Sequence, residues 1–135
     1  NAKLTVKGNT DRIASRSWQL KLYDRAGLYE GMKSFNLIKN NDDASRMKIK
    51  LGLDLASQLE DVASLRSKFV RLFVYDTTEG GLLQWEDMGI YTLVEQPNKT
   101  YLRAHGLNEN ATLYRAKNFR FEQQTEIRWF QSLMN

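Results

Sequence analysis

The chain has 135 residues, of which 41% are hydrophobic and 27% are charged, and its formal net charge is +4. These values are typical of one folded domain with one core and argue against a disordered chain. The absence of cysteine excludes disulfides and thiolate sites, and the single histidine, His105, argues against a multi-histidine metal centre or a Ser-His-Asp triad. No apolar run approaches the roughly 20 residues that cross a bilayer, so no membrane span is predicted.

The N-terminal part of the chain predicts two short strands. Leu4 and Val6 alternate with polar residues, and Gly8-Asn9 after them is typical of a turn. The segment 17–23 alternates more clearly. The apolar set of that segment is Trp18, Leu20 and Leu22. Because successive side chains of a strand point to opposite faces, Lys21 is predicted on the face opposite this apolar set.

A short strand, 34–38, and one amphipathic helix come next. The helix is predicted from about Asp43 to Glu60, with residues 40–43 supplying candidates for its N-cap. Its apolar residues recur at spacings of three and four: Met47, Leu51, Leu55, Leu59 and Val62. Such a stripe predicts that one side of the helix packs against the sheet.

Two longer strands follow the helix. The segment 69–75 is nearly all apolar, which predicts a central, well-buried strand. The segment from Met88 to Glu95 is the second strand. The two are predicted to form a hairpin with a long, irregular connection.

The last third of the chain is less regular. Pro97, the only proline, ends the strand pattern, and a short helix is predicted from Asn98 to Gly106, with a short strand over 111–115. We expect residues 1–116 to form the domain. The segment 117–135 is too apolar for a solvated tail, so we expect it to complete this domain or to begin a further lobe, and to allow self-association if uncovered.

Six segments together carry a likeness to a known family: 6–10, 17–22, 31–37, 43–56, 67–74 and 88–95. Their order and spacing, over about Leu4 to Ala116, resemble the N-terminal portion of the CotH family of atypical kinases and, more generally, the small lobe of a protein kinase. The sequence departs from the family pattern at several positions, and the segment 77–87 is longer than the family's usual turn. Lys7 stands where arginine is usual, Asp11 where serine is common, and Ile49 where asparagine is usual.

The resemblance implies an α+β fold in which an antiparallel sheet packs on one main helix. It also implies that the parent protein uses ATP and magnesium to phosphorylate Ser or Thr of an exported or coat protein. By the same resemblance, the parent is exported, on the cell surface or in a spore coat, and its partners are a protein substrate or coat and surface proteins. The abrupt start at Asn1 leads us to expect that the chain is a fragment of a longer protein.

The resemblance also assigns candidate nucleotide-binding residues. Lys21 would hold phosphates, as strand lysines do in phosphoryl transfer, and backbone amides at Gly8 and Asn9 would approach a phosphate. Glu95 would begin the hinge between two lobes, whose backbone contacts adenine, and Asp54 would pair with Lys21 from the helix. Simpler alternatives stay open: a solvent-facing lysine, a plain turn, a strand-end acid and a helix-surface acid.

The acids that bind magnesium and orient the acceptor are expected beyond the hinge, but no aspartate follows Asp87. The chain alone is therefore expected not to catalyse phosphoryl transfer and to contain no metal site. The alternative is a non-catalytic surface or coat module that keeps the kinase-like shape, which the departures at Lys7, Asp11 and Ile49 favour. A nucleic-acid-binding role is disfavoured because Lys and Arg are interleaved with acids rather than gathered with exposed aromatics.

Overall fold

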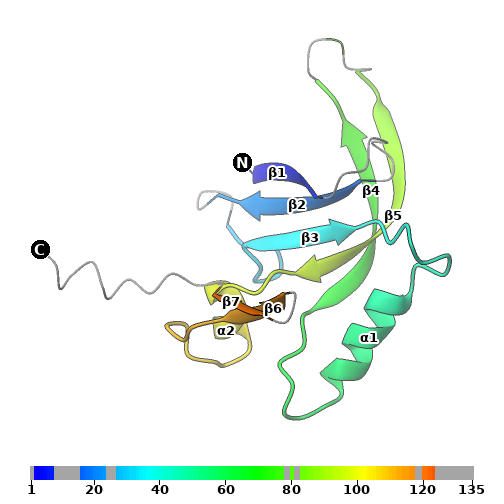
Figure 1. The fold of residues 1–135 in the computed structure, drawn as a ribbon. Coiled ribbons are helices and arrows are strands. Elements are labelled where there is room, and N and C mark those ends of the chain that lie inside the picture. The colour runs from blue at the N-terminus through cyan, green and yellow to red at the C-terminus, as the bar shows by residue number, and fades with distance from the viewer. Residues whose placement is uncertain are drawn as a thin grey trace, which may run out of the picture.

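The computed structural model describes residues 2–7, 16–23, 27–77, 80, 83–117 and 120–123, with side-chain detail up to residue 115. Its elements are β1 (Ala2–Lys7), β2 (Ser17–Leu22), β3 (Ser34–Ile38), α1 (Lys48–Ser57), β4 (Ser67–Tyr75), β5 (Trp85–Glu95), α2 (Lys99–Ala104), β6 (Tyr114–Lys117) and β7 (Arg120–Gln123) (Figure 1). Gly8, Asn9 and most of the segment 117–135 lie outside the described residues, so the predictions on them stay predictions.

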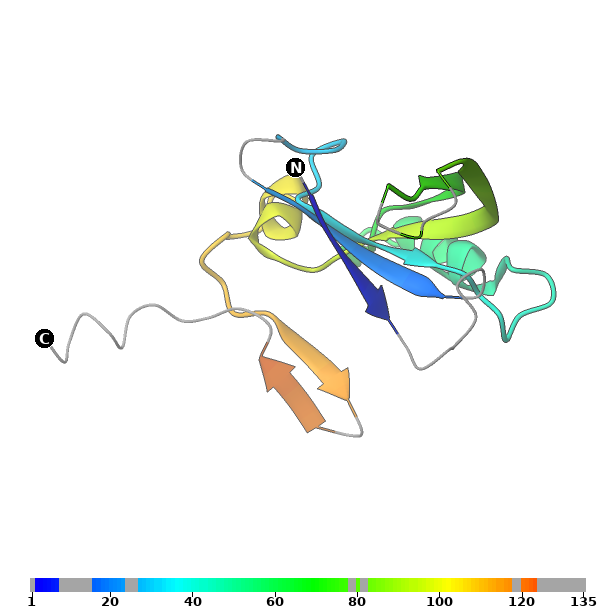
Figure 2. The same cartoon turned by 90° about the horizontal axis from the view of Figure 1, so that it is seen from above.

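The first five strands form one antiparallel sheet in the order β1-β2-β3-β5-β4. The β4–β5 pair extends beyond the other strands at one end (Figure 1). The hairpin predicted from the two later apolar segments is confirmed, since β4 pairs with β5 along its whole length. β6 and β7 pair only with each other and stand apart from the main sheet (Figure 2).

One face of the sheet carries the core. Its buried members are Met32, Phe35, Leu37, Met88, Tyr91 and Leu93, and Trp18, Leu20, Val70, Leu72 and Val74 pack against them. The register places Trp18 opposite Leu37, and residues opposite each other on antiparallel strands share a face. Lys21 is one residue beyond Leu20 and therefore lies on the other face, as predicted.

The prediction that 69–75 forms a central strand is wrong within the described sheet. β4 is an edge strand, and Phe69, Phe73 and Tyr75 are 45%, 50% and 42% exposed. β5 lies between β3 and β4, and it is buried from Tyr91 to Glu95. Continuous apolar character indicated burial on both faces, but in β4 only alternate residues reach the core.

α1 is shorter than predicted and covers little of the sheet. It begins at Lys48 rather than near Asp43, because Asp43 accepts hydrogen bonds from the Ser45 and Lys48 amides at 3.1 and 2.9 Å and shapes the turn before the helix. None of its residues is buried. Leu51 and Leu55 are 54% and 62% exposed, so the expectation of a sheet packed on one main helix is met only in part: the fold is an antiparallel sheet with two short helices.

α2 is the helix predicted from Asn98. The Asn98 side chain accepts a hydrogen bond from the Tyr101 amide at 3.0 Å, which satisfies one of the free donors at the helix start. Tyr101 and Leu102 are buried and fix the helix at the end of the sheet. The strand predicted over 111–115 forms instead at Tyr114–Lys117. No helix among the described residues is long and apolar enough to cross a membrane.

Candidate functional site

Lys21 lies in an open pocket of about 370 Å³, here called the Lys21 pocket, where β2 and β3 meet the segment after β5. Its lining residues are Gln19, Lys21, Lys33, Ser34, Gln96, Pro97, Asn98, Lys99 and Thr100. The structure therefore brings together two features that the sequence placed far apart, namely the strand lysine and the predicted hinge.

Hydrogen bonds fix the wall of the Lys21 pocket. The backbone amide of Gln96 donates to the backbone carbonyl of Ser34 at 3.3 Å, and the Asn98 side chain donates to the Ser34 hydroxyl at 2.9 Å. The Gln19 side chain bonds to that of Gln96. β2, β3 and the start of α2 are thereby held together, so the pocket is built by backbone and amide groups rather than by its lysines.

The charge of the Lys21 pocket is positive. Lys21, Lys33 and Lys99 line it, and none of the described lining residues is acidic. The Lys21 side chain is exposed and makes no hydrogen bond or ion pair with another described residue, whereas its backbone pairs with β1 and β3. A recess of one charge sign raises the local concentration of counter-ions, so this pocket favours an anionic ligand.

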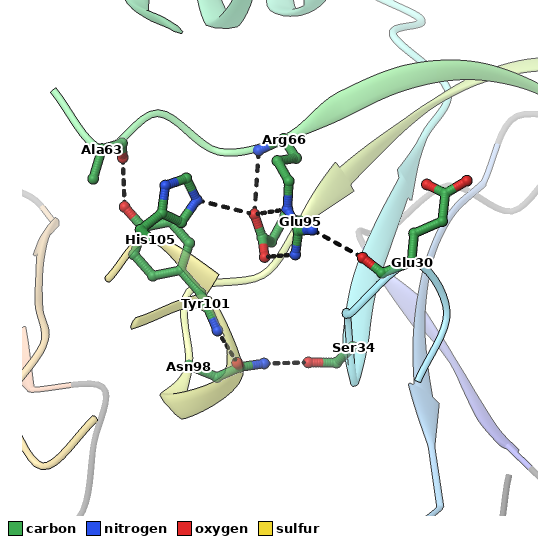
Figure 3. Close-up of polar contacts among 8 residues, drawn as sticks. All are labelled: Glu30, Ser34, Ala63, Arg66, Glu95, Asn98, Tyr101 and His105. Carbon is green, nitrogen blue, oxygen red and sulfur yellow. Dashed lines mark hydrogen bonds and ion pairs between the residues drawn. The ribbon is translucent and has the colours of Figure 1, made fainter. Parts of the chain in front are cut away.

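The Glu95 side chain belongs to a different cluster (Figure 3). It lies on the face of the sheet opposite to Lys21, because Glu95 pairs with Phe35 whereas Lys21 pairs with the next residue, Ser34. It is 1% exposed, and Arg66 holds it through Nε–Oε2 and Nη2–Oε1 bonds of 2.9 and 2.5 Å. His105 Nε2 lies 3.5 Å from the same carboxylate. Burial raises the pKa of Glu95, but the hydrogen bonds and charge of Arg66, with a contribution from His105, outweigh it and leave the pKa below its ordinary value.

The Glu95 cluster ties three separate segments together. Arg66 also donates to the Glu30 carbonyl at 2.8 Å, and the Tyr101 hydroxyl bonds to the Ala63 carbonyl (Figure 3). The Glu95 amide donates to the Arg66 carbonyl at 2.9 Å. The cluster fixes where β5 ends and where α2 begins. Glu95 therefore stabilises the segment of the predicted hinge through buried contacts, and its carboxylate does not line the Lys21 pocket.

The structure does not bring Asp54 to Lys21. Asp54 forms an ion pair with Lys50, one turn away on α1, at 2.5 Å. α1 contacts β4, and two strands, β5 and β3, separate β4 from β2. Three strand spacings of about 4.8 Å separate β2 from β4, so these two strands lie roughly 14 Å apart in the sheet. Gly8 and Asn9 are outside the described residues, so their predicted phosphate contact stays a prediction.

Sequence reasoning missed Lys33 and Lys99 as members of the Lys21 pocket. The available signals were local: Lys33 precedes the strand 34–38, and Lys99 follows the helix cap Asn98. Neither signal indicates that the two lysines line one pocket, because they come together only through the pairing of β3 with β5.

Comparison with known families decides the wider relationship. The family model described as "CotH kinase protein" matches residues 4–132, which is nearly the whole chain. The chain belongs to the CotH kinase family. The CotH resemblance of the six sequence segments is thereby confirmed. No curated protein and no solved structure matches the chain. In this CotH-family chain, the residues that the structure describes include no group of three or more His, Asp or Glu that could hold a metal ion.

Proposed function

We propose that this chain is the nucleotide-holding lobe of a CotH-family kinase and that the Lys21 pocket receives the phosphates. The observation that supports this most is the meeting of an unpaired strand lysine with residues 96–98 in one positive pocket. In the parent protein, ATP would supply the phosphoryl group and magnesium would neutralise its charge, with Ser or Thr of an exported or coat protein as the acceptor. The proposal assigns no magnesium ligand to the described residues.

Four residues of the pocket have a defined part in this proposal. Lys21 offers a compact cation on a flexible stem, the usual way a lysine binds a phosphate. Ser34, Asn98 and the amide of Gln96 hold the pocket wall through their mutual hydrogen bonds. Lys21 would therefore contribute most to affinity, and the wall would contribute orientation.

The first experiment is a thermal melt of the chain with and without Mg-ATP. A ligand at a hundredfold excess over its dissociation constant should stabilise the fold by about 2.7 kcal/mol. We expect Lys21→Ala to lose most of this shift. The matched control is Lys48→Ala, which removes the same charge from a side chain that is 78% exposed at the start of α1. Equal shifts in Lys21→Ala and Lys48→Ala, or no shift in the original chain, would contradict the proposal.

A second candidate, a non-catalytic interaction module, is favoured by the apolar surface around α1. Met47, Phe69 and Ile90 line an open pocket of about 510 Å³ together with Ser45 and Arg46. These three apolar side chains are 53%, 45% and 53% exposed. Exposed apolar surface of this kind is typical of protein contacts. Association measured by light scattering, without any nucleotide effect in the melt, would favour this candidate.

A further inference from the structure

We propose that a second pocket, continuous with the Lys21 pocket, extends the site so that it recognises a chain of phosphates, with Lys99 and Arg103 of α2 as specificity-determining residues for chain length. This second pocket, here called the α2 pocket, has a volume of about 330 Å³. The inference deepens the proposed nucleotide function by naming the residues that would distinguish a triphosphate from a monophosphate.

The two pockets adjoin because they share lining residues. Lys33, Lys99 and Thr100 belong to both. Lys21 stands in the first pocket only, and Arg103 in the second only. The pockets together therefore form a trough with four cationic side chains, and the described residues that line it include no acid. A single phosphate can contact only part of such a trough, whereas a linear polyphosphate can follow it.

α2 presents its two cations on one side. Lys99 and Arg103 are four residues apart, so they are neighbours on the helix surface. The helix itself is anchored: Asn98 caps it, Leu102 is buried, and the Tyr101 hydroxyl bonds to the Ala63 carbonyl. The positions of the two cations are thus set by a fixed element, which lowers the cost of ordering them around a ligand.

Arg103 already holds an anion. Its Nε and Nη2 atoms donate to Glu109 Oε2 at 2.8 and 2.5 Å. The Arg103 and Glu109 side chains are 69% and 45% exposed, so water and salt weaken this pair. A phosphate carries more charge than a carboxylate, and it can accept the two N–H groups of the guanidinium fork on two oxygens, whereas Glu109 accepts both on one. Glu109 therefore occupies the place at Arg103 that a phosphate would take, and removal of its charge should strengthen binding.

The test uses inorganic tripolyphosphate and orthophosphate as probes, in titration calorimetry without nucleotide or metal. We expect tripolyphosphate to bind at least about tenfold more tightly than orthophosphate, since it engages more cations. Lys99→Ala and Arg103→Ala should each weaken tripolyphosphate binding by about three- to tenfold and change orthophosphate binding by less than about twofold. Glu109→Gln, a surface change that leaves Arg103 in place, should tighten tripolyphosphate binding.

Two results would overturn the inference. The first is an unchanged affinity for tripolyphosphate in Lys99→Ala and Arg103→Ala. The second is an equal loss of affinity for tripolyphosphate and orthophosphate, which would indicate a general attraction of anions to positive charge. Lys48→Ala serves as the control for net charge. The melt with Mg-ATP and Lys21→Ala separates the two proposals. The chain-length inference alone fails if Mg-ATP shifts the melt in a way that depends on Lys21 but Lys99→Ala changes the affinities for tripolyphosphate and orthophosphate equally. If tripolyphosphate behaves as expected and ATP gives no shift, the nucleotide function alone fails.

Discussion

At the residue scale, Glu95 illustrates how a buried charge can be kept in a fold. Arg66 supplies two side-chain hydrogen bonds and its backbone amide, so that both carboxylate oxygens have a partner. An ion pair of this kind costs desolvation, and loss of one partner leaves the other with an unmet charge. Its value to the molecule is positional, since it fixes the end of β5 beside the Lys21 pocket.

Glu95→Gln tests this role through pH. The pKa of Glu95 lies below its ordinary value of 4.5, so its contribution to stability is present above that pH and is lost as the pH falls through the folded-state pKa. We expect the variant to be less stable by about 2 kcal/mol at pH 7 and to lose less stability on acidification. The measurement is urea unfolding at several pH values.

Some acid sensitivity should remain in Glu95→Gln. The pKa of Asp43 is lowered chiefly by the Lys48 amide, and that of Asp87 chiefly by the Arg71 side chain. Both groups lose a stabilising interaction when protonated. An unchanged acid profile in the variant would show that Glu95 carries none of the pH dependence.

At the element scale, β5 contains a bulge where its register with β4 shifts, next to Gly89. Gly89 has φ +79°, and a Cβ atom there would lie 3.2 Å from Lys39 Nζ. Lys39 is buried, bonds to the Met88 carbonyl and stacks over the Tyr91 ring at 4.4 Å. Burial lowers the pKa of Lys39, and the charge of Arg46 lowers it further. The charge of Asp87 acts in the opposite direction, but the pKa stays below its ordinary value.

Gly89→Ala should therefore destabilise the sheet in two ways, through the unfavourable backbone conformation and through the displacement of Lys39. We expect a loss of about 2 kcal/mol or more in chemical unfolding. Gly80→Ala is the matched control, because Gly80 also has positive φ, +86°, but open space around it. Equal losses in the two variants would mean that the Lys39 contact contributes nothing.

α1 has an apolar stripe that faces solvent, so its residues should matter little for stability. Leu55 is 62% exposed, and we expect Leu55→Gln to change the free energy of unfolding by less than about 0.5 kcal/mol. Leu93, in contrast, is 3% exposed in the core, and Leu93→Ala should cost about 3 kcal/mol. Comparable costs at the two positions would indicate that α1 is covered in solution.

At the scale of the whole molecule, the two faces of the sheet have different tasks. One face holds the core, and the other carries Lys21 near one end and the apolar residues Phe69 and Ile90 at the β4 side. The positive trough and the apolar surface around α1 are thus separate regions. Anion binding and association of copies should be separable by mutation, and Leu55→Gln should lower any self-association without changing the affinity for ATP.

Much of the fold could be predicted from the sequence. Local alternation gave β2, with Lys21 on the face away from Trp18, and the short segment 34–38 formed β3 with the expected bounds. The N-cap residue Asn98 correctly indicated where α2 begins. These features depend on neighbours within one turn or one strand, and the chain itself supplies them.

The position of β4, the exposure of α1 and the make-up of the Lys21 pocket were decided by tertiary structure. An apolar strand has the same pattern whether it lies at the centre or at the edge, and an apolar stripe on a helix does not say what covers it. Lys33 and Lys99 converge only because β3 pairs with β5 and α2 follows directly. Charge and periodicity are properties of the sequence, whereas the meeting of distant side chains depends on the pairing of strands.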